Sequence, residues 1–110
     1  MTDLKELDKL EAYLMLKGIQ YQRIDQPSLY DEEGIVMRME RHQICVPSVE
    51  PEFKLWDAIC HEGSYGHEEG LLEIYGNLVS EKDNDSVVGY LTAYDVIRRI
   101  EKEKNNNDKE

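Results

Sequence analysis

Apolar residues recur every three to four positions near the start of the chain, a spacing that predicts an amphipathic helix. Residues at i, i+3, i+4 and i+7 share one face of a helix, so their side chains can face a core together. Thr2 stands where it can cap the first turn, and Gly18 where a left-handed residue can end the helix. The inner stripe consists of Leu4, Leu7, Leu10 and Leu14.

The middle of the chain changes to a period of two, which predicts strands. Apolar and polar residues alternate, and Ile35, Met37 and Met39 share one face of the second such segment. One segment, residues 53–61, is also compatible with a short helix, but the strand is favoured because Gly63 follows it. The predicted strands cover residues 19–24, 35–40, 43–46 and 53–61.

Two further helices are predicted towards the end of the chain. Residues 67–80 carry a wide apolar face, and a polar loop over residues 81–86 follows. Thr92 and Asp95 resemble a capping box that begins the last helix, although Asp replaces the usual Glu. The apolar face of the first of these helices consists of Leu71, Leu72, Ile74, Tyr75, Leu78 and Val79.

These elements predict an α+β fold with the order α-β-β-β-β-α-α. Short connections between the strands favour an antiparallel meander of four strands, covered by the helices on one face. Residues 1–102 form one domain in this prediction, and residues 103–110 form a disordered polar tail.

The excess of acidic residues limits the classes of molecule that the chain is expected to bind. The chain has 24 acidic and 13 basic residues, a formal net charge of −11. This field repels phosphates and anionic membranes, so direct nucleic-acid binding is not expected. We expect an intracellular protein, since there is no signal peptide and no apolar run of about 18 residues. Two cysteines are too few for a disulfide framework, so both thiols are expected to be reduced.

Residues 56–76 concentrate the chemistry of the chain, and two interpretations of them stay open beside a purely structural one. In the first, acidic side chains surround an aromatic anchor and bind a basic partner protein. The expected partner-binding residues are Glu62, Tyr65, Glu68, Glu69 and Glu73. In the purely structural interpretation, the aromatic residues pack a corner and the glycines allow a tight turn.

The second interpretation is a metal site or a weak Cys/His hydrolase centred on Cys60, His61 and His67. Thiolate and imidazole are zinc ligands, and Cys45 and His42 upstream could complete the set. A nucleophilic cysteine would need one of the histidines as its base. The spacing fits no standard zinc pattern, and no cofactor is predicted. Nuclease and phosphate-loop sites are disfavoured, because the expected lysine is absent from both patterns.

Several segments resemble a family of small uncharacterised proteins of phages and prophages of Gram-positive bacteria. The similar segments are residues 18–25, 41–44, 55–76 and 85–97. The family has no assigned activity, so the resemblance implies no catalytic residue. It implies a setting, the cytoplasm of a bacterial host, and a role as an accessory or host-modulating factor rather than as a metabolic enzyme.

The sequence therefore predicts a non-enzymatic interaction module with an acidic surface. Inhibition of a host defence nuclease or another nucleic-acid-binding protein is one specific form of this role. The alternative is a small-molecule or metal-binding protein at Cys60, His61 and His67. Homo-oligomers are also compatible with the sequence, and the leucine stripe of the first helix is then the expected interface.

Overall fold

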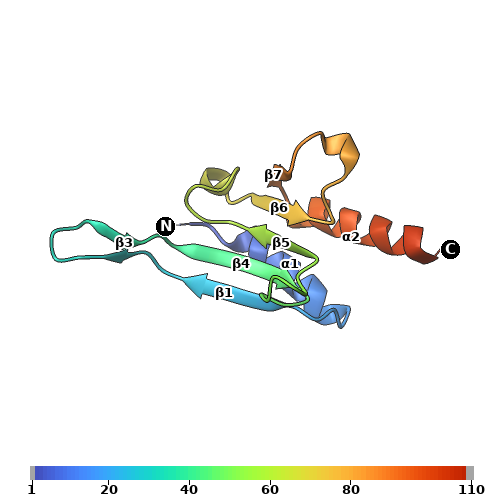
Figure 1. Cartoon of the computed structure of the whole chain (residues 1–110), viewed down its shortest axis with the longest axis horizontal. Helices are drawn as coiled ribbons and strands as arrows, with labels where there is room; N and C mark the ends of the chain where they lie inside the picture. Colours follow the sequence, from blue (N-terminus) through green and yellow to red (C-terminus); the bar gives the residue numbers. More distant parts are fainter. Residues whose placement is uncertain (1, 109–110) are drawn as a thin grey trace.

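The computed structural model describes residues 2–108, and it describes side chains for residues 2–104 (Figure 1). It has an α+β architecture with a five-stranded antiparallel sheet, a separate two-stranded sheet and two α-helices. The helices are α1 (Lys5–Leu16) and α2 (Ala93–Asp108). The strands are β1 (Gln22–Gln26), β2 (Leu29–Tyr30), β3 (Val36–Arg38), β4 (Arg41–Val46), β5 (Trp56–Ile59), β6 (Leu72–Gly76) and β7 (Val87–Leu91).

The strands of the large sheet lie in the order β1-β4-β5-β6-β7, and each pairs antiparallel with its neighbour. This is a meander in which a hairpin, β2 and β3, is inserted between the first two strands. The predicted antiparallel sheet covered by helices is confirmed, but the large sheet has five strands rather than four.

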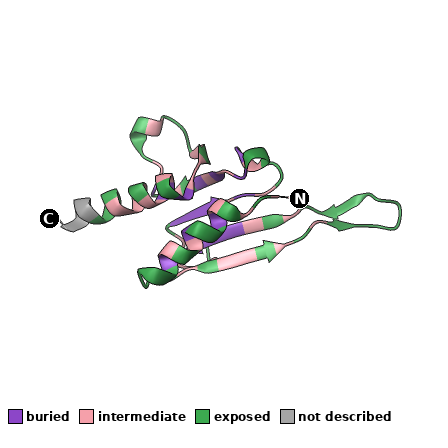
Figure 2. Ribbon diagram, turned by 180° about the vertical axis from the view of Figure 1, so that it is seen from behind, coloured by how far each residue is buried: buried purple, intermediate pink, exposed green. Residues whose placement is uncertain are grey.

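Both helices cover the same face of the large sheet, behind it in Figure 1 and in front of it in Figure 2. The alternation of side-chain directions along β4 shows which of its residues face the helices. Ile44 and Val46 point into the core, while Gln43 and Cys45, which alternate with them, point to the other face. The buried core consists of Leu7, Leu10, Leu14, Ile44, Val46, Trp56, Ala58, Cys60, Leu72, Ile74, Leu78, Ala93 and Val96.

The leucine stripe predicted for α1 is confirmed, and Leu7, Leu10 and Leu14 are fully buried. These side chains are buried in the core of their own chain. The prediction that the stripe forms an interface between copies is therefore wrong. The C-terminal end is also as expected. Gly18 has φ +67°, its N–H donates to the Met15 carbonyl, and the next amide donates to the Leu14 carbonyl.

The start of α1 differs from the prediction. Leu4 is the N-cap residue and no side chain caps the helix. The Thr2 hydroxyl instead donates to the Glu40 carboxylate, a contact between residues distant in sequence. A cap assignment from sequence weighs only local bonds, whereas Glu40 offers this hydroxyl a stronger charged acceptor.

The helix predicted over residues 67–80 is wrong. A short 3₁₀ turn, η1 (His67–Glu69), is followed by Gly70 at φ +72° and then by strand β6. Leu72 and Ile74 point inward and Tyr75 outward, so the apolar residues satisfy a period of two as well as a helical period. Pairing with β5 on one side and β7 on the other decided between the two patterns. Strand β7 was not predicted.

Helix α2 begins as predicted and ends later. The Asp95 N–H donates to the Thr92 hydroxyl, and the Thr92 N–H donates to the Asp95 carboxylate, which completes the capping box. The helix continues to Asp108, beyond the predicted boundary at residue 102. The last two residues of the predicted tail lie outside the described residues. None of the described helices is long and apolar enough to cross a membrane.

Candidate functional site

The segment singled out from sequence is a compact loop that joins β5 to β6. Ser64 is buried and ties the loop together, because its hydroxyl donates to the His61 carbonyl (2.7 Å) and accepts the His61 N–H (3.1 Å). Gly66, at φ +98°, carries a carbonyl that accepts the N–H groups of Glu69 and Leu71. The loop is therefore held in shape by its own hydrogen bonds, from the Ser64 hydroxyl and from the backbone.

The loop also packs against β7, which fixes its position on the sheet. The Tyr90 N–H donates to the Tyr65 carbonyl at 3.3 Å. Gly89 lies so close to Tyr65 that an added Cβ would stand 2.3 Å from the Tyr65 Cβ. The Tyr65 N–H donates to the Glu73 carboxylate at 3.0 Å, and this carboxylate belongs to β6. Tyr65 is thus held from two neighbouring strands.

These contacts create a shallow hollow of about 150 Å³ between two tyrosines. Tyr65 and Tyr90 are exposed by 59% and 60%, so both rings are accessible. Glu68 and Glu69 are exposed on the 3₁₀ turn beside them. The hollow is lined by Ser64, Tyr65, Gly66, His67, Glu68, Glu69 and Tyr90. We call Tyr65, Glu68, Glu69 and Tyr90 the junction surface.

The structure brings three of the five expected partner-binding residues to this hollow. Tyr65, Glu68 and Glu69 line it, and Glu73 holds the Tyr65 backbone. Glu62 is exposed but does not line the hollow, and its N–H donates to the Glu40 carboxylate at 2.8 Å. Tyr90 was missed from sequence. Nothing in its local pattern indicates the site, because it arrives there through the pairing of β6 with β7.

In the described part of the chain, the carboxylates of this region form no ion pair, although the His67 ring lines the same hollow. Within the described side chains, no Lys, Arg or His lies within ion-pair distance of Glu62, Glu68, Glu69 or Glu73. Other acids of the chain are neutralised locally. Asp83, for example, forms a two-pronged pair with Arg99 at 2.9 Å for both contacts. The junction surface therefore keeps its negative charge available for another molecule.

The Cys60, His61 and His67 arrangement does not form a catalytic or metal-binding group. Cys60 is fully buried under α1, and its thiol donates to the Asp3 carbonyl at 3.5 Å. Burial raises the pKa of Cys60 to about 11, and the nearby Asp3 and Glu40 carboxylates add to this shift. The thiolate needed for attack or for zinc binding is therefore strongly disfavoured.

The histidines are engaged elsewhere. The His61 Nδ1 accepts the His42 backbone N–H at 3.1 Å, and burial lowers the pKa of His61. The His42 ring lies between two carboxylates, 2.8 Å from Asp25 and 3.4 Å from Glu40. His67 is apart from both, at the hollow. In the part of the chain that the structure describes, no three His, Cys, Asp or Glu side chains could hold a metal ion.

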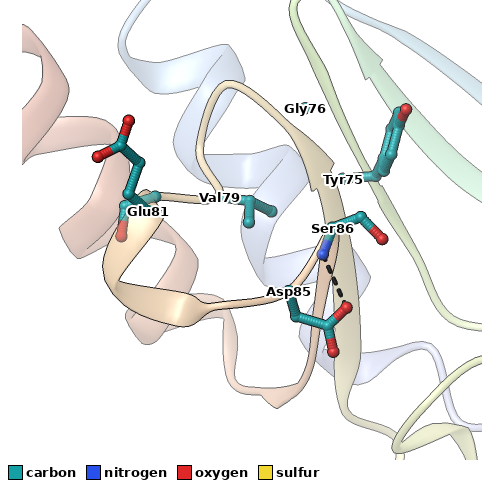
Figure 3. A pocket seen from close by; sticks show the side chains of 7 residues that line it. Tyr75, Gly76, Val79, Glu81, Asp85 and Ser86 are labelled. Atoms are coloured by element: carbon teal, nitrogen blue, oxygen red, sulfur yellow. Dashed lines mark hydrogen bonds between the residues drawn. The ribbon is translucent and has the colours of Figure 1, made fainter.

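A second, more open hollow of about 370 Å³ lies near the turn between β6 and β7. Tyr75 and Val79 contribute apolar surface, and Figure 3 shows Glu81 and Asp85 pointing in different directions. The Asp85 carboxylate accepts the N–H of the next residue, Ser86, at 2.7 Å. Ser80 also lines this hollow, and its hydroxyl donates to the Asp83 carboxylate at 3.1 Å as part of the capping box of the 3₁₀ turn at residues 81–83.

Comparisons with protein-family models, with curated proteins and with solved structures found no match for this chain.

Proposed function

We propose that the chain is a non-enzymatic interaction module whose junction surface binds a basic surface of a partner protein. The observation that carries the proposal is the group of exposed, unneutralised carboxylates beside two exposed tyrosines. An acidic field accelerates the approach of a basic partner, and an aromatic side chain held by its backbone anchors it after contact. The net charge of −11 acts in the same direction.

The support is strongest for a Lys- or Arg-rich contact on the partner. A cationic side chain entering the hollow would meet the ring of Tyr65 or Tyr90 and the carboxylates of Glu68 and Glu69. Cations are attracted to aromatic faces as well as to carboxylates, and both attractions strengthen as water is excluded. The anchor is already positioned, because Glu73 and the backbone of β7 hold the Tyr65 main chain.

The specific role that we propose is that of a phage-type accessory protein acting in a bacterial host. Its acidic surface would then occupy a site on a host defence or nucleic-acid-binding protein where phosphates normally bind. Such a site is basic by necessity, because phosphate contacts dominate nucleic-acid affinity. The resemblance to small phage proteins supports this setting, and the unneutralised carboxylates support the chemistry.

The first test is affinity capture from lysate of the bacterial host with tagged full-length chain. The test variant is Glu68→Gln with Glu69→Gln, and the control is Glu50→Gln with Glu52→Gln. Both variants lose two negative charges, and all four residues are exposed, so the overall charge is matched. We expect wild type and control to capture a basic partner at a stoichiometric level. The test variant should capture roughly tenfold less of this partner, or even less than that. Equal capture by all three proteins would remove the junction surface from the proposal.

A competition experiment separates the specific role from general binding to a basic protein. The captured complex is challenged with duplex DNA and, separately, with increasing salt. Release by DNA would support occupation of a nucleic-acid site, whereas a ternary complex would contradict that role. Release by salt is expected in either case, since the screening length falls from about 10 Å at 0.1 M to about 3 Å at 1 M.

The anchor is tested through the dissociation rate. Tyr65→Ala keeps the charge of the surface and removes the ring, so we expect faster dissociation with little change in the association rate or its salt dependence. The Glu68 and Glu69 variant should show the reverse pattern. Equal dissociation rates for Tyr65→Ala and wild type would contradict the assignment of Tyr65 as the anchor.

A further inference from the structure

Strands β2 and β3 form a hairpin that projects from the body of the molecule (Figure 1). We call residues 27–40 the arm. It contributes to an elongated shape, with extents of 58 × 28 × 26 Å along the principal axes. All residues from 29 to 39 are exposed, so the middle and the tip of the arm lack cover. This part of the fold is not explained by the junction surface.

The arm is held in shape by its own hydrogen bonds. At its tip, the Asp31 carboxylate accepts the N–H groups of Glu33 and Ile35, both at 2.9 Å. At its base, Arg38 donates to the Pro27 carbonyl (3.3 Å), and the Glu40 N–H donates to the Ser28 hydroxyl (3.1 Å). A partner would therefore meet a preformed hairpin and would not have to order it.

The apolar side chains of the arm are unusual for a hairpin exposed to water. Their exposed fractions lie between 46% and 65%, and together they present on the order of 600 Å² of surface, as large as the largest patch on a typical monomer. Isolated two-stranded hairpins are marginally stable, and most need a third strand or packing against another element. The exposed apolar residues are Leu29, Tyr30, Ile35, Val36, Met37 and Met39.

The outer edge of β3 is only partly protected. In the described structure each of its strands pairs only with the other, so one edge of β3 keeps unpaired backbone groups. Exposed edges are normally blunted by short strands, bulges, Lys or Pro. Strand β3 is short and β2 carries a bulge, but Pro27 stands only at the base of the arm, and between Lys17 and Lys54 the chain contains no lysine. Such an apolar edge is suited to pairing with another strand over a few residues.

We propose that the occupant of this edge is a second copy of the same chain, paired through β3 about a two-fold axis. The charges of the arm support this choice over an unrelated partner. Its tip carries acids at residues 31–33, whereas Arg38 and Arg41 lie at the base. None of these side chains takes part in an ion pair within the described residues.

An antiparallel two-fold arrangement places the acidic tip of one arm against the basic base of the other. With Val36 of the two copies opposed at the axis, the acids at residues 31–33 in the tip of one arm lie towards Arg38 at the base of the other, and symmetry repeats this contact. Opposite charges that face each other across an antiparallel pair stabilise it, and like charges destabilise it. Pairing in the same direction would instead oppose acids to acids.

The size of the contact and the net charge set the expected affinity. Pairing through β3 would bury at most the apolar surface of both arms, on the order of 1,200 Å², which is the lower limit for a specific interface, so a dissociation constant in the micromolar range or weaker is expected. The net charge of −11 on each copy opposes association. The arms keep the two bodies apart, and at about 0.1 M salt this repulsion is screened beyond roughly 10 Å.

Exchange of the opposed charges tests both the partner and the register. In sedimentation velocity from about 1 to 100 µM, a range that brackets the expected constant, wild type should pass from monomer to dimer. Glu33→Arg alone and Arg38→Glu alone should each weaken self-association at least tenfold, because like charges then face one another twice. An equimolar mixture of the two variants restores both pairs and should dimerise again. Glu50→Arg, a matched charge change on an exposed loop residue outside the arm, should leave self-association unchanged.

Every outcome of this experiment bears on the proposal. Monomeric wild type over the whole range would overturn it, and so would variants that fail to complement one another. Indefinite aggregation in place of a dimer would show an unprotected edge without a two-fold partner. Ile35→Asp should also yield a monomer; at about 1 µM, where wild type is monomeric too, its unfolding temperature should equal that of wild type, because Ile35 lies outside the core. None of these results depends on the junction surface, and a confirmed dimer would present two such surfaces to one partner.

Discussion

The contact between Gly89 and Tyr65 offers a direct test of how the junction surface is held. A Cβ at Gly89 would lie 2.3 Å from the Tyr65 Cβ and 3.0 Å from the Tyr65 carbonyl oxygen. Carbon atoms that are not bonded prefer about 3.5–4.0 Å, so Gly89→Ala must displace the loop from β7 by roughly 1 Å or more. The obstructing atoms belong to the backbone and the first side-chain carbon, which cannot rotate away.

The energetic cost follows from these contacts. Overpacking by one carbon typically costs about 1–3 kcal/mol. The displacement also weakens two hydrogen bonds, from Tyr90 N–H to the Tyr65 carbonyl (3.3 Å) and from Tyr65 N–H to Glu73 (3.0 Å). The smaller entropy of the unfolded alanine variant returns about 0.4–1 kcal/mol. We therefore expect Gly89→Ala to lower the free energy of unfolding by about 2 kcal/mol, and Tm by about 10 °C.

Thermal unfolding followed by circular dichroism measures this loss, and a second substitution identifies its cause. Tyr65→Gly removes the obstructing Cβ, so the double variant with Gly89→Ala should regain about 1 kcal/mol relative to additivity. Tyr65→Ala keeps the Cβ and should give no such recovery. Partner capture by Gly89→Ala should weaken together with stability, because the hollow between the two tyrosines is distorted.

Two results would refute this reasoning. Wild-type stability in Gly89→Ala would mean that the loop moves freely over β7, and the described hollow would not be a fixed feature. Equal recovery with Tyr65→Gly and Tyr65→Ala would show that the ring, and not the backbone approach, causes the conflict.

Two further predictions concern titration and thiol reactivity. Hydrogen bonds from Arg99 and from Ser80 lower the pKa of Asp83 in the folded protein. These bonds stabilise the fold fully at a pH above the unfolded pKa of Asp83, about 4, and the stabilisation is lost as the pH falls towards the lower pKa of the folded state. Arg99→Met should therefore be less stable than wild type at pH 7, with a difference that shrinks in acid-unfolding scans below about pH 4; a constant difference would contradict the linkage. Burial raises the pKa values of Cys60 and Cys45, so native protein at about pH 8 should react with iodoacetamide far more slowly than protein unfolded in urea. Rapid modification of folded protein, read by mass spectrometry, would contradict the placement of both thiols.

The two α-helices were predictable because their signals are local. The leucines of α1 repeat within the helix itself, and the Thr92 and Asp95 pair caps α2 through bonds that span three residues. Such patterns need no knowledge of distant neighbours. The end of α2 was not predicted, because a run of polar residues without a stop signal fits a helix and a disordered tail equally well.

The error over residues 67–80 has a different origin. Leucine, isoleucine and tyrosine at these positions satisfy a helical period and a strand period together, and only the flanking strands distinguish them. A strand between β5 and β7 gains two ladders of backbone bonds, whereas a helix interrupted by two glycines loses about 1 kcal/mol at each. The information that decided the structure lies in residues 56–59 and 87–91, outside the window in which the pattern was evaluated.

The same limit applies to the candidate site. Glu68 and Glu69 are adjacent in sequence, and their grouping with Tyr65 follows from the shortness of the loop. Tyr90 joins them only because β7 pairs with β6 and a glycine at position 89 lets the loop approach. Cys60 and His61 are adjacent in sequence, but just after the end of β5 the Cys60 thiol is buried in the core, whereas the His61 ring accepts the His42 N–H. The density of reactive residue types therefore singled out this segment, but strand pairing decided which of its side chains share a surface, and it grouped acidic and aromatic side chains while burying the Cys60 thiol.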